Sequence, residues 1–222
     1  MIFEVDANQI SRLDSVTLVQ LMKRLLLAEC QLVEIPLRAV AAPLQITVPD
    51  GGEDGRVQWE GGVAFTNYLP SRFCIFQSKA RNLTEGAVKA EVFAKSEKAK
   101  SEGKENRPIL NSALLTALKS CRGSYVIFCS HPFTGNKIEK LQNAIKEVIR
   151  EAGYAPSRLA AIEIYDANKI ADWVNTHPAV ALSLGSYERR RSVSGFQSHE
   201  APEIATVRCA RINPEEGDES VI

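Results

Sequence analysis

Apolar residues recur along the chain with two different periods, and these periods predict helices and strands in a definite order. In the range Ser15–Leu32 the apolar positions Leu18, Met22 and Leu25 are three or four residues apart, which is the spacing along one face of an α-helix. An aspartate and a serine at the start of the range provide helix-capping side chains. We therefore expect one helix over this range.

Three short runs rich in β-branched and aromatic residues follow this helix and are separated by glycines and prolines. They are residues 44–49, 56–60 and 72–80. Such runs with turn residues between them predict three strands connected as a meander. The third run is apolar at successive positions, which is typical of a central strand covered on both faces.

The second half of the chain alternates between helical and strand patterns. Helices are predicted over residues 83–100, 109–121, 136–154 and 167–175, and strands over residues 125–130 and 159–166. A strand, a helix and a strand in succession are typical of a βαβ unit. The fold class is therefore predicted to be α/β, a sandwich with a central mixed β-sheet. We expect one domain over residues 1–186 and a polar tail or linker over residues 187–222, where apolar periodicity fades.

Composition narrows the function classes. The 27 Lys and Arg residues balance 27 Asp and Glu residues, so net charge gives no support for strong attraction to nucleic acid or to an anionic membrane. The five cysteines are odd in number, have no metal-ligand spacing and lie mostly in apolar runs, which predicts reduced, buried thiols. The start of the chain lacks the pattern of a signal peptide, and no apolar segment approaches a membrane span. We expect a cytoplasmic protein.

Acid, amide and amine side chains are expected to meet where the second and third predicted strands lie side by side. Asp54 lies in the turn that opens the second strand, and Gln77 and Lys79 lie near the end of the third. Because side chains alternate across a strand, Gln77 and Lys79 face one side, and Ser78 between them offers its backbone carbonyl. Metal-assisted hydrolysis of a phosphodiester needs a carboxylate and further oxygen ligands for the ion, and a cation near the attacking water. These residues provide that set.

Glu29 is a further candidate metal ligand, because it continues the apolar stripe of the first predicted helix. An unpaired carboxylate at such a position costs several kcal/mol, and a bound cation removes that cost. The alternative is that the side chain of Glu29 reaches solvent near the end of its helix.

Asp50 and Glu53 compete with Asp54 for the role of the acid. Asp50 directly follows a proline at a strand end, which is typical of a turn residue, whereas Asp54 and the glycine after it lead into the next strand. Asp54 is favoured on this ground, and Asp50 stays open as the alternative ligand.

Basic residues outnumber acidic ones between Lys79 and Arg107. Phosphate contacts that do not depend on base sequence are therefore expected from Lys79, Arg81 and Lys89. The alternative is a solvated helix of mixed charge.

The stretches DGGEDG, residues 50–55, and FQSKA, residues 76–80, resemble the G-x-D-G and Q-x-K motifs of the PD-(D/E)xK superfamily of restriction-endonuclease-like nucleases, in the Mrr-like variant. The resemblance implies a restriction-endonuclease-like α/β/α sandwich. It implies that Lys79 is the catalytic lysine and that Asp54 and Gln77 take the places of the two acids. The implied cofactor is Mg²⁺, with Mn²⁺ as a substitute, held by Asp54, Glu29, the side-chain oxygen of Gln77 and the backbone carbonyl of Ser78.

The later stretches GSYVIFCS and ANKIADWVNTHPAVAL resemble the distal part of nuclease domains found at the N-termini of antiviral defence proteins with a STAND-type NTPase. The expected function is therefore a Mg²⁺-dependent endonuclease acting on double-stranded DNA, as the effector domain of an anti-phage protein. Expected partners are DNA, further copies of the chain in an active homo-oligomer, and a fused or separate NTPase or sensor domain. The alternative is a catalytically inactive nuclease-like module for nucleic-acid binding or assembly, because glutamine supplies no charge to a metal ion.

Overall fold

The structure is a computed structural model that describes residues 4–42, 53–93, 109–120 and 122–185. All of these residues belong to one compact unit of the chain. The strand predicted at residues 44–49 and the tail predicted over residues 187–222 lie outside the described residues.

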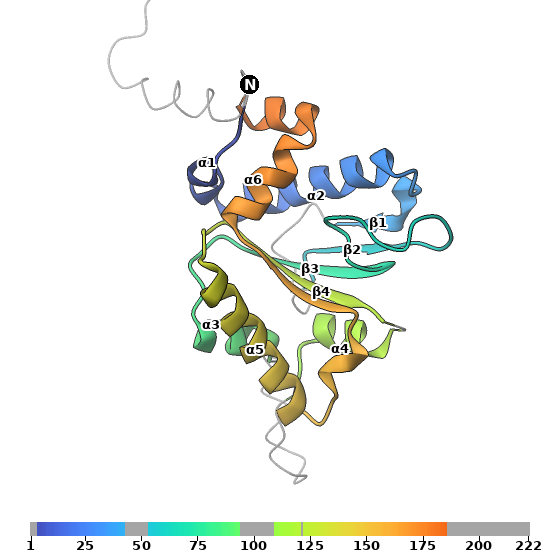
Figure 1. Ribbon diagram of the computed structural model, residues 1–222, viewed down its shortest axis with the longest axis vertical. Coiled ribbons are helices and arrows are strands. Elements are labelled where there is room, and N and C mark those ends of the chain that lie inside the picture. Colours follow the sequence, from blue (N-terminus) through green and yellow to red (C-terminus); the bar gives the residue numbers. More distant parts are fainter. Residues whose placement is uncertain (1–3, 43–52, 94–108, 121, 186–222) are drawn as a thin grey trace, which may run out of the picture. The chain divides into compact units, whose positions relative to one another are not determined.

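Five strands of the described part of the chain form one mixed sheet in the order β1-β2-β3-β4-β5 (Figure 1). In chain order they are β1 (Val40–Ala41), β2 (Gly55–Gln58), β3 (Phe73–Lys79), β4 (Ser124–Cys129) and β5 (Ala161–Tyr165). The first three strands are antiparallel neighbours, as a meander requires, and β4 and β5 run parallel to β3. β3 is thus the middle strand, which confirms the expectation drawn from its apolar run.

Helices cover both faces of this sheet. They are α1 (Ala7–Ser11), α2 (Ser15–Leu32), α3 (Glu85–Val92), α4 (Ser112–Lys119), α5 (Gly135–Glu151) and α6 (Ala167–Asn175), with short 3-10 helices η1 (Leu37–Ala39) and η3 (Pro156–Arg158). The chain is helical again over residues 178–185. α1, α2 and α6 pack on one face, and α3, α4 and α5 pack on the other (Figure 1). The predicted α/β class with a mixed sheet is confirmed. None of the helices in the described ranges is both long and apolar enough to cross a lipid bilayer.

The two sides of β3 belong to two separate hydrophobic clusters. Cys74 and Phe76 are fully buried against the helices α2 and α6, whereas Ile75 between them is fully buried in the cluster of α3, α4 and α5. Side chains alternate along a strand, so this pattern carries on to the strand end and turns Gln77 and Lys79 toward α3.

Local sequence signals account for the helix starts. α2 has the predicted bounds, and Asp14 caps it by accepting the backbone N–H of Thr17 at 2.8 Å. The apolar pattern does not predict α1, because five residues are too few to display a helical period. This helix depends on a capping box instead: Asp6 accepts the N–H of Gln9 at 2.8 Å, and the Gln9 side chain accepts the N–H of Asp6 at 2.9 Å.

The cysteines of the described ranges are buried thiols, as predicted. They are Cys30, Cys74 and Cys129, and none of them forms a disulfide. Burial raises the pKa of Cys30 and Cys129 to about 11 and that of Cys74 to about 12.

Candidate functional site

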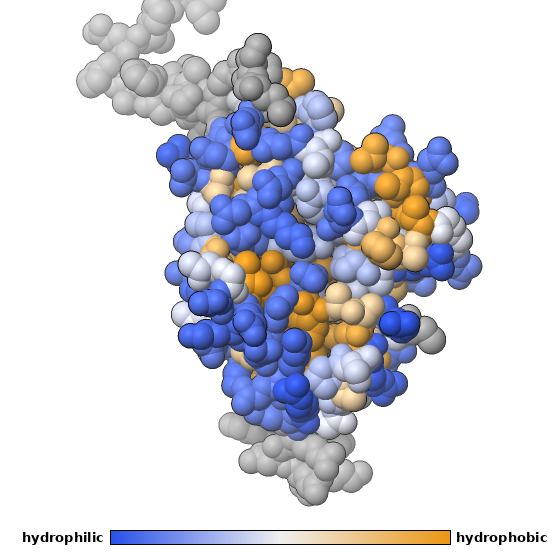
Figure 2. All heavy atoms as spheres, in the orientation of Figure 1, coloured by the Kyte–Doolittle hydropathy of each residue, from blue (hydrophilic) through white to orange (hydrophobic). Residues whose placement is uncertain are grey.

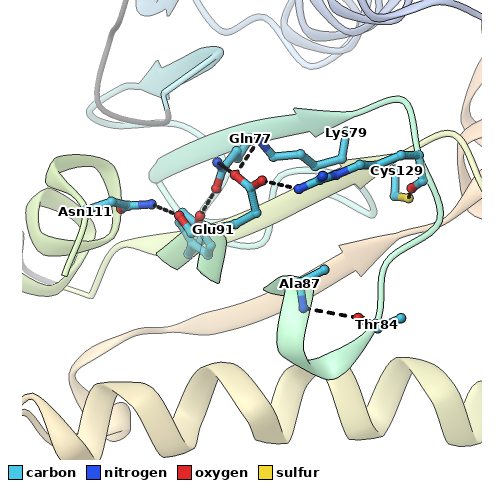
Figure 3. Close-up of polar contacts among 9 residues, drawn as sticks. Gln77, Lys79, Thr84, Ala87, Glu91, Asn111 and Cys129 are labelled. Atoms are coloured by element: carbon cyan, nitrogen blue, oxygen red, sulfur yellow. Dashed lines mark hydrogen bonds and ion pairs between the residues drawn. The ribbon is translucent and has the colours of Figure 1, made fainter. Parts of the chain in front are cut away.

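Glu91 joins the side chains of Gln77 and Lys79 on the α3 side of the sheet. Lys79 Nζ lies 2.7 Å from Glu91 Oε2, and Gln77 Nε2 donates a hydrogen bond of 3.1 Å to the same oxygen. Arg81 approaches the other carboxylate oxygen with an N···O distance of 2.5 Å. Figure 3 shows the side chains of Gln77 and Lys79 converging on Glu91. Gln77 and Lys79 therefore share a face, as strand alternation predicts.

Helix α3 fixes the position of Glu91. Thr84 caps the helix by accepting a backbone N–H of its first turn at 3.1 Å, and Val88 and Val92 are fully buried under it. Glu91 lies three positions after Val88 and therefore beside this inner face. Asn111 Nδ2 donates a hydrogen bond of 2.8 Å to the backbone carbonyl of Glu91, which ties the end of α3 to the start of α4 (Figure 3).

Tyr125 orients the amide of Gln77. Its hydroxyl donates to Gln77 Oε1, so the amide NH₂ is the group that faces Glu91. Burial raises the pKa of Tyr125, and the negative charges of Glu91 and Asp54 raise it further. Tyr125 therefore keeps its proton and acts as a donor at neutral pH. Because both carboxylates act on this one buried hydroxyl, they lie in the same region of the fold.

Asp54 stands where β2 begins beside β3. Its Oδ2 accepts the N–H of Ser78 at 2.7 Å, and its own N–H donates to the carbonyl of Phe76 at 2.9 Å. The pairing of β2 with β3 extends only as far as Gly55 opposite Phe76. Beyond Gly55, the next N–H group of β3 on this side, that of Ser78, is therefore accepted by the Asp54 carboxylate and not by a backbone carbonyl of β2. In an extended strand one residue directs its N–H and C=O to the same edge, so the Ser78 carbonyl also faces Asp54.

Asp54 and Lys79 lie at the same end of β3. A Cβ added at Gly55 would meet Met22 Cε of α2 at 3.0 Å, so position 55 faces α2. Asp54 lies in the bend before β2, and its carboxylate reaches the N–H of Ser78, the residue that precedes Lys79. The acid and the amine are therefore near each other at the end of β3, where Lys79 contacts Glu91.

Glu29 lies apart from this group. It is 4% exposed, and its Oε2 accepts a hydrogen bond from Trp173 Nε1 at 3.1 Å and lies 3.1 Å from His177 Nε2. Trp173 belongs to the cluster of α2 and α6, on the face of the sheet opposite to Lys79. The expectation that Glu29 shares a metal ion with Asp54 is therefore not supported by the structure. Two hydrogen-bonding side chains, those of Trp173 and His177, compensate for its burial.

Asp50 and Glu53 are the two alternatives to Asp54 as the metal-binding acid. Asp50 lies outside the described residues. Glu53 Oε2 pairs with Arg56 at 2.6 Å, which is a local contact between residues three positions apart. Of the acids weighed from the sequence, Asp54 is the one whose contact with β3 the structure describes.

Arg81 and Lys89, the further candidate phosphate contacts, lie in different surroundings. The side chain of Arg81 is 58% exposed, compared with 19% for Lys79, so the Glu91 group opens to solvent on the Arg81 side. Lys89 pairs with Glu147 of α5 at 2.5 Å, and this hydrogen bond raises the pKa of Lys89. Lys89 precedes Glu91 by two positions and so lies on another side of α3.

The residues at this site suit only a lightly held metal ion. Within the described ranges, no three His, Cys, Asp or Glu side chains converge as metal ligands. Mg²⁺ often uses one or two carboxylates and takes its other ligands from water and phosphate. Asp54 and the Ser78 carbonyl fit that mode. Glu91 is available as a second carboxylate only where Lys79 and Arg81 leave it, because these cations and Gln77 occupy its oxygens in this structure. Gln77 fits poorly as a ligand, because Tyr125 already donates to its amide oxygen.

Glu91, Tyr125 and Asn111 complete the group but are not identified from the sequence. A signal for Glu91 exists: it lies on the apolar stripe of a predicted helix, beside Val88, which is the criterion that singles out Glu29. Tyr125 has no such signal, since it is one apolar position among several in a buried strand.

Comparison of the chain with models of known protein families, with curated proteins and with solved structures found no match.

Proposed function

We propose that this chain is a Mg²⁺-dependent nuclease that hydrolyses phosphodiester bonds of double-stranded DNA. One observation carries the proposal: Asp54, which directly precedes β2, accepts the N–H of Ser78 at 2.7 Å, so its carboxylate lies one residue from Lys79 at the end of β3. An α/β sandwich with a mixed sheet is compatible with the restriction-endonuclease-like fold that the motifs imply.

Each side chain has a role in this proposal. Asp54 and the Ser78 carbonyl would hold Mg²⁺, with Glu91 as the second carboxylate. The bound ion would lower the pKa of a water ligand and polarise the scissile phosphate. Lys79 would donate hydrogen bonds to the phosphate oxygen on which charge grows in the transition state. Gln77 would keep Glu91 in place through its amide NH₂.

The resting pair of Lys79 and Glu91 is consistent with this division of roles. The ammonium is held 2.7 Å from the carboxylate and is 19% exposed, so it is positioned before substrate arrives. An incoming phosphate would replace Glu91 as the partner of Lys79 and release that carboxylate toward the ion. Arg81, which is 58% exposed, would contact a neighbouring phosphate of the same strand.

The proposal includes assembly. Because 27 basic residues balance 27 acidic ones, a single copy has little long-range attraction for DNA. Several copies gathered together would combine weak contacts into stable binding. The active form is therefore proposed to be a homo-oligomer, brought together by an NTPase or sensor region of an anti-phage protein.

Nicking of supercoiled plasmid tests the proposal. The purified chain, alone and dimerised through a fused coiled coil, is incubated with Mg²⁺, with Mn²⁺ or with EDTA, and relaxed circles are measured on agarose gels. We expect metal-dependent nicking that falls about 100-fold or more in Lys79→Ala and in Asp54→Asn. Lys119→Ala, an exposed lysine of α4, is the matched control and keeps full activity. Nicking that persists in EDTA or in Lys79→Ala contradicts the proposal.

A second candidate is a nuclease-like module that binds nucleic acid without cleaving it. The observation that favours it is the complete pairing of the polar group: Glu91 accepts from Gln77 and pairs with both Lys79 and Arg81, and Tyr125 donates to Gln77. Such a group also serves purely to hold α3 against the sheet. If wild-type protein binds DNA in EDTA but never nicks plasmid, in either assembly state, this candidate is the correct one.

A further inference from the structure

A pocket of about 530 Å³ lies beside the ends of β4 and β5, outside the group formed by Asp54, Lys79 and Glu91. Three separate parts of the chain provide its polar and aromatic walls, namely Asn67 and Tyr68 before β3, Phe133 before α5, and Asp166, Asn168 and Asp172 at the start of α6. It is a shallow pocket that is open to solvent along most of its surface. Figure 1 shows that α3, α5 and α6 all start near the carboxyl ends of strands β3, β4 and β5. Parallel α/β sheets usually bind their ligands at this end of the strands.

Asp166 holds two walls of the pocket together. It is 3% exposed, and its Oδ2 accepts the N–H of Phe133 at 2.9 Å and an N–H of the Asn168 side chain at 2.8 Å. Its Oδ1 caps α6 by accepting the N–H of Lys169 at 3.0 Å. The carboxylate of Asp166 is thus already used by three donors, which makes the pocket a preformed one and leaves this acid poorly suited to hold a metal ion.

The third wall is equally well fixed. The ring of Tyr68 stacks on Trp173 with a centroid distance of 4.8 Å and an interplanar angle of 7°. The hydroxyl of Tyr165 donates to the backbone carbonyl of Tyr68 at 3.2 Å. Tyr68 packs against the cluster of α2 and α6, and Phe133 packs against the cluster of α3, α4 and α5. The pocket therefore extends past the carboxyl ends of the strands from one face of the sheet to the other.

Backbone hydrogen bonds connect the segments that line the pocket to the end of β3. The N–H of Ser130 donates to the carbonyl of Lys79 at 3.0 Å, and the N–H of Ala167 donates to the carbonyl of His131 at 3.2 Å. From β3 to β5 is two strand spacings, or roughly 10 Å. That distance corresponds to about three base steps of rise along the axis of B-DNA.

Two cations lie between the pocket and Lys79. Lys137 Nζ is 4.9 Å from the centre of the Phe133 ring and donates to Asn82 Oδ1 at 3.1 Å. Lys137 and Arg81 both act electrostatically on the thiol of Cys129, at the end of β4. The carboxylates of Asp166 and Glu91 lie among these cations, so the positive charge here is partly balanced, and Lys137 and Arg81 are the side chains that can contact phosphates of a bound nucleic-acid strand.

The lining itself suits a flat group that stacks and forms hydrogen bonds. Phe133 and Tyr68 provide aromatic rings, one side of which is already covered by Lys137 in Phe133 and by Trp173 in Tyr68, and the amides of Asn67 and Asn168 provide donors and acceptors. The exposed carboxylate of Asp172 accepts hydrogen bonds and repels an anion. Nucleobases combine a stacking surface with a polar edge, and aromatic and amide side chains are the usual groups that hold an unpaired base.

We propose that this pocket takes one unpaired nucleobase of the nucleic-acid strand whose phosphates lie along the Arg81 and Lys137 side of the sheet. This inference rests on the proposed nuclease function for its choice of ligand. It adds a feature to the substrate: a base turned out of the duplex, or an already unpaired base, near the bond that is cut. An enzyme that needs such a base acts preferentially on distorted or partly unwound DNA, because turning out a paired base costs several kcal/mol.

Binding of two matched duplexes in EDTA tests the inference without any cleavage. One labelled duplex carries a single unpaired nucleotide in its middle, and the other carries an abasic residue at the same place. Dissociation constants are measured by fluorescence anisotropy at fixed salt. Wild-type protein is expected to bind the duplex with the base at least about 5-fold more tightly, the lower end of what stacking of one base supplies.

Variants show whether the preference belongs to this pocket. Phe133→Leu keeps an apolar side chain but removes the ring, and is expected to abolish the preference, whereas Phe133→Tyr keeps it. Asp172→Asn alters an exposed side chain and is expected to reduce the preference. Glu139→Gln, an exposed acid of α5 outside the pocket lining, is the matched control and leaves it unchanged. Thermal unfolding of each variant verifies that it is folded.

Three outcomes overturn the inference: equal binding of the two duplexes by wild-type protein, no measurable binding of either, or a preference that survives in Phe133→Leu. Its failure is distinguishable from failure of the nuclease proposal. Metal-dependent nicking without a base preference rejects the pocket alone, and a base preference without nicking rejects the nuclease alone.

Discussion

The ammonium of Lys79 and the carboxylate of Glu91 lie 2.7 Å apart, and their side chains are only 19% and 10% exposed. The lysine was expected from a motif at the end of a strand, whereas its partner comes from a helix that starts six residues later. An amine removed from water needs such a partner, because a buried charge without one is strongly destabilising. Removal of the Glu91 carboxylate should therefore lower the free energy of unfolding, which can be measured independently of any activity.

Glu91→Ala is expected to lower the free energy of unfolding by about 1–3 kcal/mol, because it leaves Lys79, and the donor amide of Gln77, without their common acceptor. Urea unfolding followed by circular dichroism measures the loss. Glu147→Ala is the matched control, since it removes the acid of another pair between a lysine and a glutamate but at an exposed position of α5. That variant is expected to unfold almost as wild type does. Equal losses in the two variants would contradict this account.

Glu29→Gln is expected to destabilise the fold without changing the response to metal. Trp173 and His177 both contact one oxygen of the Glu29 carboxylate, Oε2, and a neutral amide oxygen in its place is a weaker acceptor than a charged carboxylate oxygen. The free energy of unfolding is expected to fall by about 1–3 kcal/mol. The Mg²⁺ concentration that gives half-maximal plasmid nicking should stay the same, because Glu29 and Lys79 lie on opposite faces of the sheet. A shift of that concentration would restore Glu29 as a metal ligand.

The regular elements near the site follow from local pattern, which explains why they are predictable. The apolar stripe of α2 and the apolar run of β3 are strong signals, and both are confirmed. Alternation along β3 then places Gln77 and Lys79 on one face without any knowledge of the rest of the fold. Short elements such as β1, with two residues, have no period and escape this reasoning.

The partners of the polar side chains are less predictable, because they come from distant parts of the chain. A helical stripe indicates that Glu29 points inward but not which face of the sheet its helix covers. Its partners Trp173 and His177 are 144 and 148 positions away in the sequence. Glu91 lies on an equally clear apolar stripe of its own helix. The helical pattern alone therefore indicates two inward-facing acids, Glu29 and Glu91, and the tertiary structure decides which of them lies beside Lys79.

The buried thiols predict the direction of the pH dependence of stability. Burial raises the pKa of Cys30 and Cys129 from 9.0 to about 11, and that of Cys74 from 9.0 to about 12. The unfolded chain therefore loses these protons above pH 9 while the folded chain retains them. The stabilisation is complete below pH 9 and is lost as the pH rises from 9 toward 11 or 12, at up to about 1.4 kcal/mol per pH unit for each thiol.

Urea unfolding at several pH values between 8 and roughly 10.5 measures this slope. Cys74→Ala is the informative variant, because its free energy of unfolding should fall less steeply with pH than that of wild type, whatever its stability at pH 8. Buried tyrosines such as Tyr125 act in the same direction in both proteins and cancel in the comparison. Identical slopes would show that the Cys74 thiol does not keep its proton in the folded state.

Gly123 is expected to be intolerant of any side chain. It lies between α4 and β4, where an added Cβ would approach the carbonyl of Ala117 to 2.8 Å and Phe73 Cδ1 to 2.9 Å, as well as the hydroxyl of Ser120. The backbone here has little freedom to withdraw, because the Gly123 carbonyl accepts the N–H of Ala160 at 2.8 Å. Overpacking of this kind costs about 1–3 kcal/mol. Gly123→Ala is therefore expected to lower the melting temperature by roughly 2–12 °C.

The matched control for this last variant is Gly135→Ala at the first residue of α5. No atom lies within 4 Å of a Cβ added there, and alanine has a higher helix propensity than glycine. Its melting temperature should equal or exceed that of wild type, as measured by circular dichroism. The contrast separates crowding from the general effect of replacing a glycine, since alanine restricts the unfolded chain similarly at both positions. If both variants melt at the wild-type temperature, the close packing of α4 and β3 around Gly123 is not a rigid feature of the fold.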